Sequence, residues 1–146
     1  MASMTWIRDS DNEMTHSDAI EVKRVKGKGR GVFALRSIRD GELIERVPVV
    51  VLKTNDVKDS EGWTGLAAYC FHWTKGTLAL ALGYGSLYNH SYRPNARYDD
   101  LEGQIKEFIA IRNIEPGEEI TVNYNGEPQD DSPVGFKVVM REQPAT

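Results

Sequence analysis

Three short segments of this 146-residue chain contain polar residues in patterns that could carry out chemistry. Residues 89–95 (Asn-His-Ser-Tyr-Arg-Pro-Asn) place two amides, an imidazole and a proline where strand or helix patterning favours apolar side chains. Residues 117–124 (Gly-Glu-Glu-Ile-Thr-Val-Asn-Tyr) combine a turn, two carboxylates, a β-prone run and a terminal tyrosine. Residues 27–31 (Gly-Lys-Gly-Arg-Gly) alternate glycine with cations, so the backbone can approach a ligand with no Cβ in the way.

Each segment also has a plainer interpretation. A glycine-rich run is often only a β-turn, and this one lacks the dinucleotide-binding fingerprint because no helix pattern follows it. An isolated histidine is more often a satisfied core residue than a ligand. The amides that flank His90 favour a binding role, because an amide both donates and accepts hydrogen bonds, as the amino acid or adenine part of a cofactor requires. A tyrosine that ends a strand, as Tyr124 would, is more often packing, so the segments carry weight together and not singly.

Length and composition indicate one globular domain with its own core. Hydrophobic content of 40% and charged content of 27% are ordinary for such a domain. We expect no membrane association and an intracellular protein, cytoplasmic or nuclear, because there is no long apolar run and no secretory h-region. The lone Cys70 excludes an intrachain disulfide and a cysteine zinc cluster, and His16, His72 and His90 lack metal-ligand spacing, so no metal site is predicted.

The net charge of -4 is unevenly distributed along the chain. Between residues 99 and 131 the only cations among many carboxylates are Lys106 and Arg112, and an acidic surface beside a site would favour a basic protein or peptide substrate. A solvated face is the plainer interpretation. Residues 23–30 are basic, which could indicate a nucleic-acid or nuclear-import patch. Their glycines favour a tight loop instead, so direct nucleic-acid binding is not expected.

The remaining pattern predicts a mostly β chain. A helix is expected over residues 63–73, where apolar residues follow helical spacing and Ser60 could cap the start. Pro48 implies an edge strand or a bulge. Residues 1–16 are polar and aperiodic, as in a loose terminus, and the proline-containing residues 127–146 resemble an extended tail. Alternating or β-prone runs predict strands at residues 20–25, 32–35, 43–47, 49–52 and 105–112.

One motif occurs twice. Residues 36–44 and 112–120 share arginine, isoleucine, glycine, glutamate and isoleucine at equivalent positions. Each predicts a strand end, a glycine-centred turn and a new strand. Two copies are too few for a solenoid, so they predict two similar corners of one β-rich domain.

The three polar segments, in this order, resemble the SET domain, a protein-lysine methyltransferase fold. The resemblance covers about residues 18–126. It implies a mostly β, β-clip fold with several small sheets, one short helix near residues 60–74 and a knot-like C-terminal substructure. The expected organisation is a loose segment at 1–17, the SET domain at 18–126 and a C-terminal tail at 127–146.

The resemblance also implies a cofactor, S-adenosylmethionine, and roles for individual residues. Tyr124 would be the catalytic group, Tyr98 would line the lysine channel, and Asn95 would support the binding loop. A small Val122, where other members place an aromatic, implies lower-order methylation. Tyr92 and Asn123 depart from the cysteine and aspartate common in the family. The residues implied to bind the cofactor are Lys28, Gly29, Arg30, Asn89, His90 and Tyr124.

The implied reaction needs no metal and no nucleophilic side chain. Methyl transfer from a sulfonium to lysine is an in-line displacement that requires the neutral amine. Lysine has a pKa of about 10.4, so deprotonation at neutral pH costs about 4–5 kcal/mol. An apolar aromatic channel lowers that pKa by desolvation, while tyrosine hydroxyls and backbone carbonyls orient the amine.

The sequence lacks the cysteine-rich zinc segments of many SET enzymes and resembles the minimal viral and bacterial members. The viral members form homodimers, so the resemblance implies a dimer, and Phe136 of the tail could close the channel. The substrate is left open among a histone tail, a ribosomal protein and other basic partners. Two rival hypotheses are a catalytically inactive SET-like module that binds a peptide or partner, and a small nucleic-acid-binding β-domain.

Overall fold

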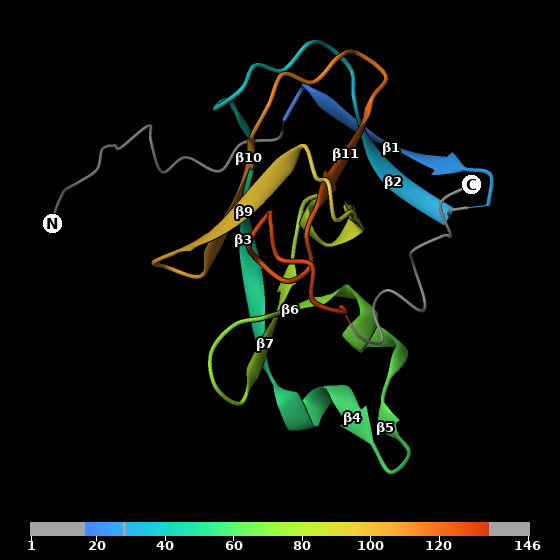
Figure 1. Cartoon of the computed structure of the whole chain (residues 1–146). Coiled ribbons are helices and arrows are strands. Elements are labelled where there is room, and N and C mark those ends of the chain that lie inside the picture. The colour runs from blue at the N-terminus through green and yellow to red at the C-terminus, as the bar shows by residue number, and fades with distance from the viewer. Residues whose placement is uncertain (1–16, 28, 135–146) are drawn as a thin grey trace, which may run out of the picture.

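The structure, a computed structural model, describes residues 17–27 and 29–134, and these are mostly β. They form a four-stranded sheet of order β1-β2-β11-β8, a five-stranded sheet of order β6-β7-β3-β10-β9 and the small pair β4-β5 (Figure 1). The strands are β1 (Ile20–Val25), β2 (Gly29–Ala34), β3 (Leu43–Lys53), β4 (Lys58–Asp59), β5 (Gly62–Trp63), β6 (Cys70–His72), β7 (Thr77–Ala81), β8 (Asn89–His90), β9 (Ala96–Leu101), β10 (Ile105–Ala110) and β11 (Glu119–Val122). The 3-10 helices are η3 (Thr54–Val57), η4 (Gly65–Tyr69) and η5 (Gly85–Leu87).

Strand β3 runs through the five-stranded sheet and changes partner at Pro48. Its first half pairs with β10 up to the Pro48–Ile105 pair, and its second half pairs with β7 from Val49 onward. Figure 1 shows β9 and β10 beside one end of β3 and β6 and β7 beside the other. Each half of β3 therefore lacks a neighbour on one side. This explains how a proline, which has no N–H to donate, lies within a strand that the sequence predicted to be interrupted.

The five-stranded sheet curls so that its two outermost strands meet. Although β6 and β9 end the sheet order, Phe71 of β6 and Tyr98 of β9 contact each other edge to face, with ring centroids 4.9 Å apart. Phe108 of β10 lies behind both, at 6.4 Å from Phe71 and 6.1 Å from Tyr98. The curled sheet thus encloses an aromatic cluster within the core.

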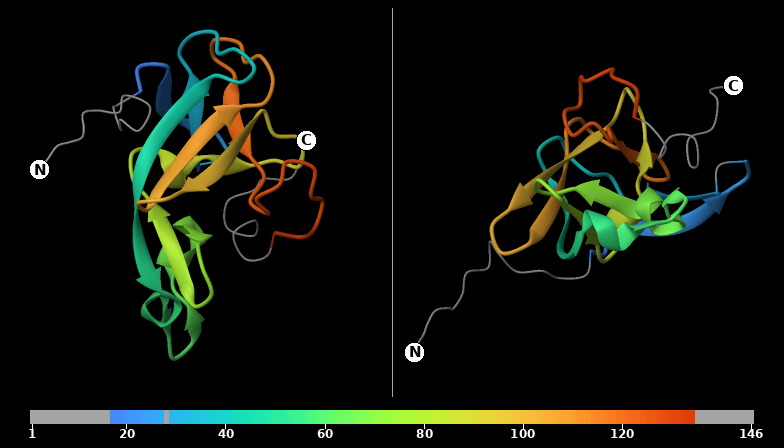
Figure 2. Two further views of the ribbon diagram at one scale, coloured as in Figure 1. Left: turned by 90° about the vertical axis from the view of Figure 1, so that its left-hand side faces the viewer. Right: turned by 90° about the horizontal axis from the view of Figure 1, so that it is seen from below.

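The four-stranded sheet joins segments that are far apart in the sequence. Strand β11 pairs antiparallel with β2 and parallel with β8, where Thr121 is opposite Asn89 and Val122 opposite His90. A parallel pair needs a long connection, and here that connection contains β9 and β10. In the right-hand view of Figure 2 the β1–β2 hairpin (blue) projects away from the green β6–β7 region.

The helix expected near residues 60–74 is present only as the five-residue 3-10 helix η4. Thr64, not Ser60, is its N-cap, and Thr64 makes no side-chain capping bond. Cys70–His72 form β6 and pair with β7, although the spacing predicted helix through residue 73. Pairing with β7 buries Cys70 and Phe71, and this tertiary contact outweighs a weak local helix preference.

The twice-occurring motif forms two corners that pair with each other. Ile38 and Ile114, the equivalent isoleucines, form a bridge in which each amide donates to the other carbonyl, at 2.9 and 2.7 Å. Both are almost completely buried in the common core. The prediction of two similar β corners is therefore confirmed.

The predicted domain boundaries and the knot-like substructure stay predictions. Residues 1–16 and 135–146, including Phe136, lie outside the described residues, as does Lys28. After β11 the chain returns toward the segment that follows β8, where the Tyr92 hydroxyl donates to the Ser132 carbonyl at 3.2 Å. Among the residues that the structure describes, no helix is both long and apolar enough for a membrane span.

Candidate active site

Asn89 connects the glycine segment to β11. Its amide nitrogen donates to the Arg30 carbonyl at 2.9 Å and to the Glu119 carboxylate at 2.7 Å. Gly31 lies against this pair, where an added Cβ would stand 2.5 Å from Glu119 Oε2 and 3.0 Å from Asn89 Nδ2. Gly31 is therefore required by close approach, while Gly29 is required by its φ of 79°.

His90 is held by the backbone of Tyr124. The Tyr124 amide donates to His90 Nδ1 at 3.0 Å, and the two ring centroids are 5.2 Å apart. A backbone N–H can only donate, so Nδ1 carries no proton and the neutral ring is protonated at Nε2. The segment that follows β11 thus determines the tautomer of a buried imidazole.

The two tyrosines that the resemblance placed in the site are connected to each other. The Tyr98 hydroxyl donates to the Tyr124 carbonyl at 3.2 Å, and the Tyr124 hydroxyl donates to the Tyr88 carbonyl at 2.8 Å. Burial, followed by the nearby carboxylate of Asp100, raises the pKa of Tyr98 well above its ordinary value. Tyr98 is therefore a neutral phenol that cannot act as a base near neutral pH.

Glu45 anchors this group of tyrosines, and sequence reasoning missed it. Its carboxylate is 6% exposed and accepts the Tyr88 hydroxyl at 2.8 Å and the Tyr84 amide at 2.9 Å. Burial and the Glu45 charge both raise the pKa of Tyr88. Tyr88 also stacks on Phe108 at 4.4 Å, so the carbonyl that receives Tyr124 belongs to a fixed residue. The available signal was that Glu45 and Arg46 are the two charged residues in the otherwise apolar run of residues 43–52.

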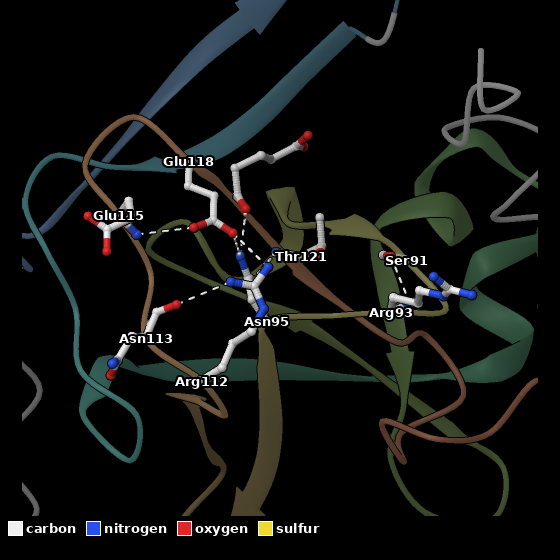
Figure 3. Close-up of polar contacts among 9 residues, drawn as sticks. Ser91, Arg93, Asn95, Arg112, Asn113, Glu115, Glu118 and Thr121 are labelled. Atoms are coloured by element: carbon white, nitrogen blue, oxygen red, sulfur yellow. Dashed lines mark hydrogen bonds and ion pairs between the residues drawn. The ribbon is translucent and has the colours of Figure 1, made fainter.

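Asn95 lies among the polar contacts that Figure 3 shows with Glu118 and Thr121. Its amide nitrogen donates to Glu118 Oε2 at 3.1 Å and to the Glu119 carbonyl at 2.8 Å, and its oxygen accepts the Thr121 amide at 2.9 Å. Asn95 is 1% exposed. These bonds hold the segment after β8 against β11, the structural role that the resemblance implied for this residue.

Asn123, a departure from the family's usual aspartate, has a local explanation. Its amide nitrogen donates to the carbonyls of Pro128 at 3.2 Å and Asp130 at 2.6 Å, and its oxygen accepts the Asn125 amide at 3.0 Å. An ionised aspartate has no donor for the two carbonyls. The asparagine therefore fits the turn that follows β11.

Lys106 is the second feature that sequence reasoning missed. It is 0% exposed, forms an ion pair with Asp100, and stands over the rings of Phe71, Tyr98 and Trp73 at 4.3, 4.4 and 5.6 Å. Burial lowers the pKa of Lys106, and Asp100 opposes that effect. The sequence signal for its burial was that Lys106 shares the apolar face of β10 with Phe108 and Ala110.

An open hollow of about 450 Å³ lies beside the start of β2. It is mainly apolar, with Arg30, Tyr69 and Ser86 as its polar members. Leu66, Leu80, Ala81, Leu82, Gly83 and Leu87 complete its lining. Its dimensions and mixed lining suit part of a small-molecule ligand.

The structure brings together nearly all of the predicted site residues. Arg30 meets Asn89, His90 meets Tyr124, and Tyr124 meets Tyr98. Val122 is completely buried in register with His90, and Tyr92 packs edge to face on His90 at 4.3 Å. No cluster of potential metal ligands occurs among the described residues.

Fold and site together define a SET domain. The SET-domain model matches residues 29–125, and the chain belongs to this family. It is 33% identical over 106 residues to the Schizosaccharomyces pombe histone-lysine N-methyltransferase specific for H3 lysine-37, covering 72% of each protein. It is 31% identical over 127 residues to human histone-lysine N-methyltransferase 2B, covering 81% of this chain and 5% of that protein.

A solved structure agrees with these relatives. The crystal structure of a Plasmodium falciparum protein assigned as a histone methyltransferase matches with a TM-score of 0.60 and 30% identity, over 76% of this chain and 95% of that one. The relatives support protein-lysine methyltransferase activity for this chain.

Proposed function

We propose that the protein transfers a methyl group from S-adenosylmethionine to the side-chain amine of lysine in a basic protein. The observation that carries this proposal is the parallel pairing of β8 with β11. It brings Asn89 and His90 of β8 beside Arg30 of β2 and beside Tyr124, which follows β11. A histone is the substrate class that the named relatives favour, and it would place the protein in the nucleus.

The residues present fit the proposed cofactor. The backbone of Gly29 and Arg30 and the neighbouring hollow, which Arg30 lines, form a cradle beside Asn89. We assign Gly29, Arg30, Asn89, His90 and Tyr124 to cofactor binding, with Lys28 outside the described residues. When bound, the cofactor supplies a methyl group on a sulfonium, which is open to in-line displacement.

The chain's own residues would orient the substrate amine. The Tyr98 proton is engaged with the Tyr124 carbonyl, so the lone pairs of its oxygen are available to accept a hydrogen bond from an amine. Because Tyr98 stays neutral, it does not take the proton from lysine. The amine must lose its proton by desolvation on entering the aromatic site, and the tyrosines then hold it in line.

The charge around Tyr98 supports a basic substrate. Asp99 and Asp100 follow Tyr98 on β9, an outermost strand of the five-stranded sheet, and Glu127 lies close enough to influence the Tyr98 phenol. Asp100 keeps 41% of its side chain exposed. Asp99 and Asp100 form ion pairs with Arg97 and Lys106, so Glu127 contributes most of the attraction for a lysine-containing peptide over an acidic one. We also propose a homodimer, as in the viral members, and analytical ultracentrifugation would measure the oligomeric state.

Calorimetry with S-adenosylmethionine tests the cofactor assignment. Asn89→Ala should abolish binding, because it removes the amide between β2 and β11. Asn113→Ala is a matched control, since Asn113 is exposed and its oxygen only accepts the Asp40 amide. Absence of binding by folded wild-type protein would favour the rival hypothesis of an inactive SET-like binding module.

Mass spectrometry of lysine peptides tests the reaction. Tyr124→Phe should lower turnover about 100-fold or more with the fold intact, since it removes the hydroxyl assigned to catalysis. Undiminished methylation by this variant would refute the role of Tyr124.

A further inference from the structure

The reaction described so far assigns no role to Lys106. The sides of its ammonium are covered by the aromatic rings of Phe71, Trp73 and Tyr98, and it forms an ion pair with the half-exposed Asp100. β10 places Lys106 on the same face as Phe108, opposite Asp100 of β9 and Val47 of β3. The curl of the sheet, which brings β6 to β9, completes this enclosure.

Filling the core does not explain a cation at this position. Burying an ammonium costs several kcal/mol of solvation, and replacing a buried ion pair with apolar side chains of similar volume is often neutral or stabilising. A methionine or leucine would fill the same space among three aromatic rings. A charge is therefore useful here only through what it does to its neighbours.

The neighbour that matters is Tyr98. Phe71 packs on the Tyr98 ring edge to face at 4.9 Å, and Lys106 attracts the ring electrostatically at 4.4 Å. These contacts limit rotation and tilt of the ring, whose hydroxyl reaches the Tyr124 carbonyl. A direct path of contacts therefore runs from Asp100 through Lys106 and Tyr98 to Tyr124.

We propose that Lys106 is a positioning residue of the lysine channel, which clamps the Tyr98 ring so that its oxygen meets the substrate amine. This inference rests on the proposed function, which assigns Tyr98 to that channel. Lys106 touches neither cofactor nor substrate, and it acts only through Tyr98. A misplacement of the Tyr98 oxygen by a fraction of an ångström would lower turnover without affecting cofactor binding.

The first test compares Lys106→Met with the wild type. Methionine keeps the volume and removes the charge, so we expect about tenfold lower kcat, unchanged S-adenosylmethionine affinity by calorimetry, and unfolding stability equal to or above wild type. Arg46→Met is the matched control, because the Arg46–Glu107 pair (3.0 Å, both side chains 14% exposed) joins β3 to the neighbouring position of β10, on the opposite face from Lys106. This control should leave kcat unchanged.

The second test asks whether Lys106 acts through Tyr98. Tyr98→Phe removes the hydroxyl that Lys106 is proposed to place, so Lys106→Met should cause no further loss of kcat in that background. Additive losses, or an Lys106→Met enzyme with wild-type kcat, would overturn the inference. Lys106→Leu provides a second variant that removes the charge at similar volume, with a loss in the same direction, should Lys106→Met fold poorly.

A third measurement needs no turnover. With ¹³C-labelled tyrosine, NMR should show slow flipping of the Tyr98 ring in wild type and faster flipping in Lys106→Met, with no change in Arg46→Met. An unchanged flip rate refutes the clamp. If the wild type methylates no lysine, the proposed function and the channel role fail together, while the flip rates still decide whether Lys106 holds Tyr98.

Discussion

The two corners formed by residues 36–44 and 112–120 have the same local structure and different surroundings. In the first, Arg36 pairs with Glu42 at 2.8 Å, and in the second, Arg112 pairs with Glu118 at 2.6 Å. In each, the glutamate also accepts a backbone amide three residues earlier at 3.0 Å. The Gly41 amide donates to the Ala110 carbonyl at 2.8 Å, and the Gly117 amide donates to the Ala34 carbonyl at 2.7 Å.

The second corner differs because the candidate site is bonded to it. Glu118 also accepts the Asn95 amide, and Glu119 accepts the Asn89 amide. In the first corner the position equivalent to Glu119 is Leu43, which is 40% exposed. The same sequence motif thus makes the same turn twice, and only one copy holds the asparagines of the site. Local sequence determines the turn, whereas its role depends on the segment that packs beside it.

The largest effect should come from removing the support of the second corner. Asn95→Ala eliminates three partly buried hydrogen bonds and leaves the Thr121 amide without its acceptor. We expect about 2–4 kcal/mol lower free energy of unfolding by urea denaturation. A loss below about 0.5 kcal/mol would show that the second corner, like the first, is stable without hydrogen bonds from an asparagine.

Exchanging one residue between the corners should lower the affinity for the cofactor. Glu119→Leu gives the second corner the residue of the first and removes the charged acceptor of Asn89. We expect about tenfold weaker S-adenosylmethionine binding by calorimetry, since such a bond contributes about 1.5 kcal/mol. Leu43→Glu is the reciprocal control and should bind like wild type. Equal affinity in both variants would separate Glu119 from the cofactor site.

Replacing the turn glycine by alanine should destabilise the two corners equally. Gly41 and Gly117 have φ of 86° and 84°, and an added Cβ would meet no atom within 4 Å at either position. Only the left-handed conformation opposes alanine, so Gly41→Ala and Gly117→Ala should each destabilise by about 1 kcal/mol. Thermal unfolding of the two variants side by side measures the difference. Clearly unequal losses would mean that the corners differ in strain as well as in surroundings.

The smallest effect concerns the pH dependence of the two ion pairs. The hydrogen bond from Arg36 lowers the pKa of Glu42. Burial opposes a lower pKa for Glu118, but hydrogen bonds from Arg112, Glu115 and Asn95 outweigh it. A lowered pKa means that each carboxylate stabilises the fold above its unfolded-state pKa, and this contribution is lost as pH falls through the folded-state value.

Glu42→Gln and Glu118→Gln should each remove part of the acid-side loss of stability, by less than about 1 kcal/mol because both side chains are partly exposed. Urea denaturation across pH 3–7 measures it. An acid-side loss of stability as large in either variant as in the wild type would contradict the assignment.

Much of the fold was predictable because its signals are local. Strands at residues 20–25 and 105–110 follow from alternation, and the corners follow from glycine turns. The helix expected through residue 73 was too long, because the decisive contact, β6 on β7, joins residues that are not neighbours in sequence. The interruption expected at Pro48 is a change of strand partner, which no local pattern specifies.

The sequence by itself determined the three polar segments, their order and the family to which the chain belongs, because turns, glycines and motif residues depend on local chemistry. Tertiary structure alone decided that Glu45 anchors Tyr88, that Asn123 donates to two carbonyls, and that Lys106 lies among three aromatic rings. The physical reason is that the energy of a buried charge or amide depends on partners brought from distant strands. Those partners exist only after the sheet has curled and β8 has paired with β11.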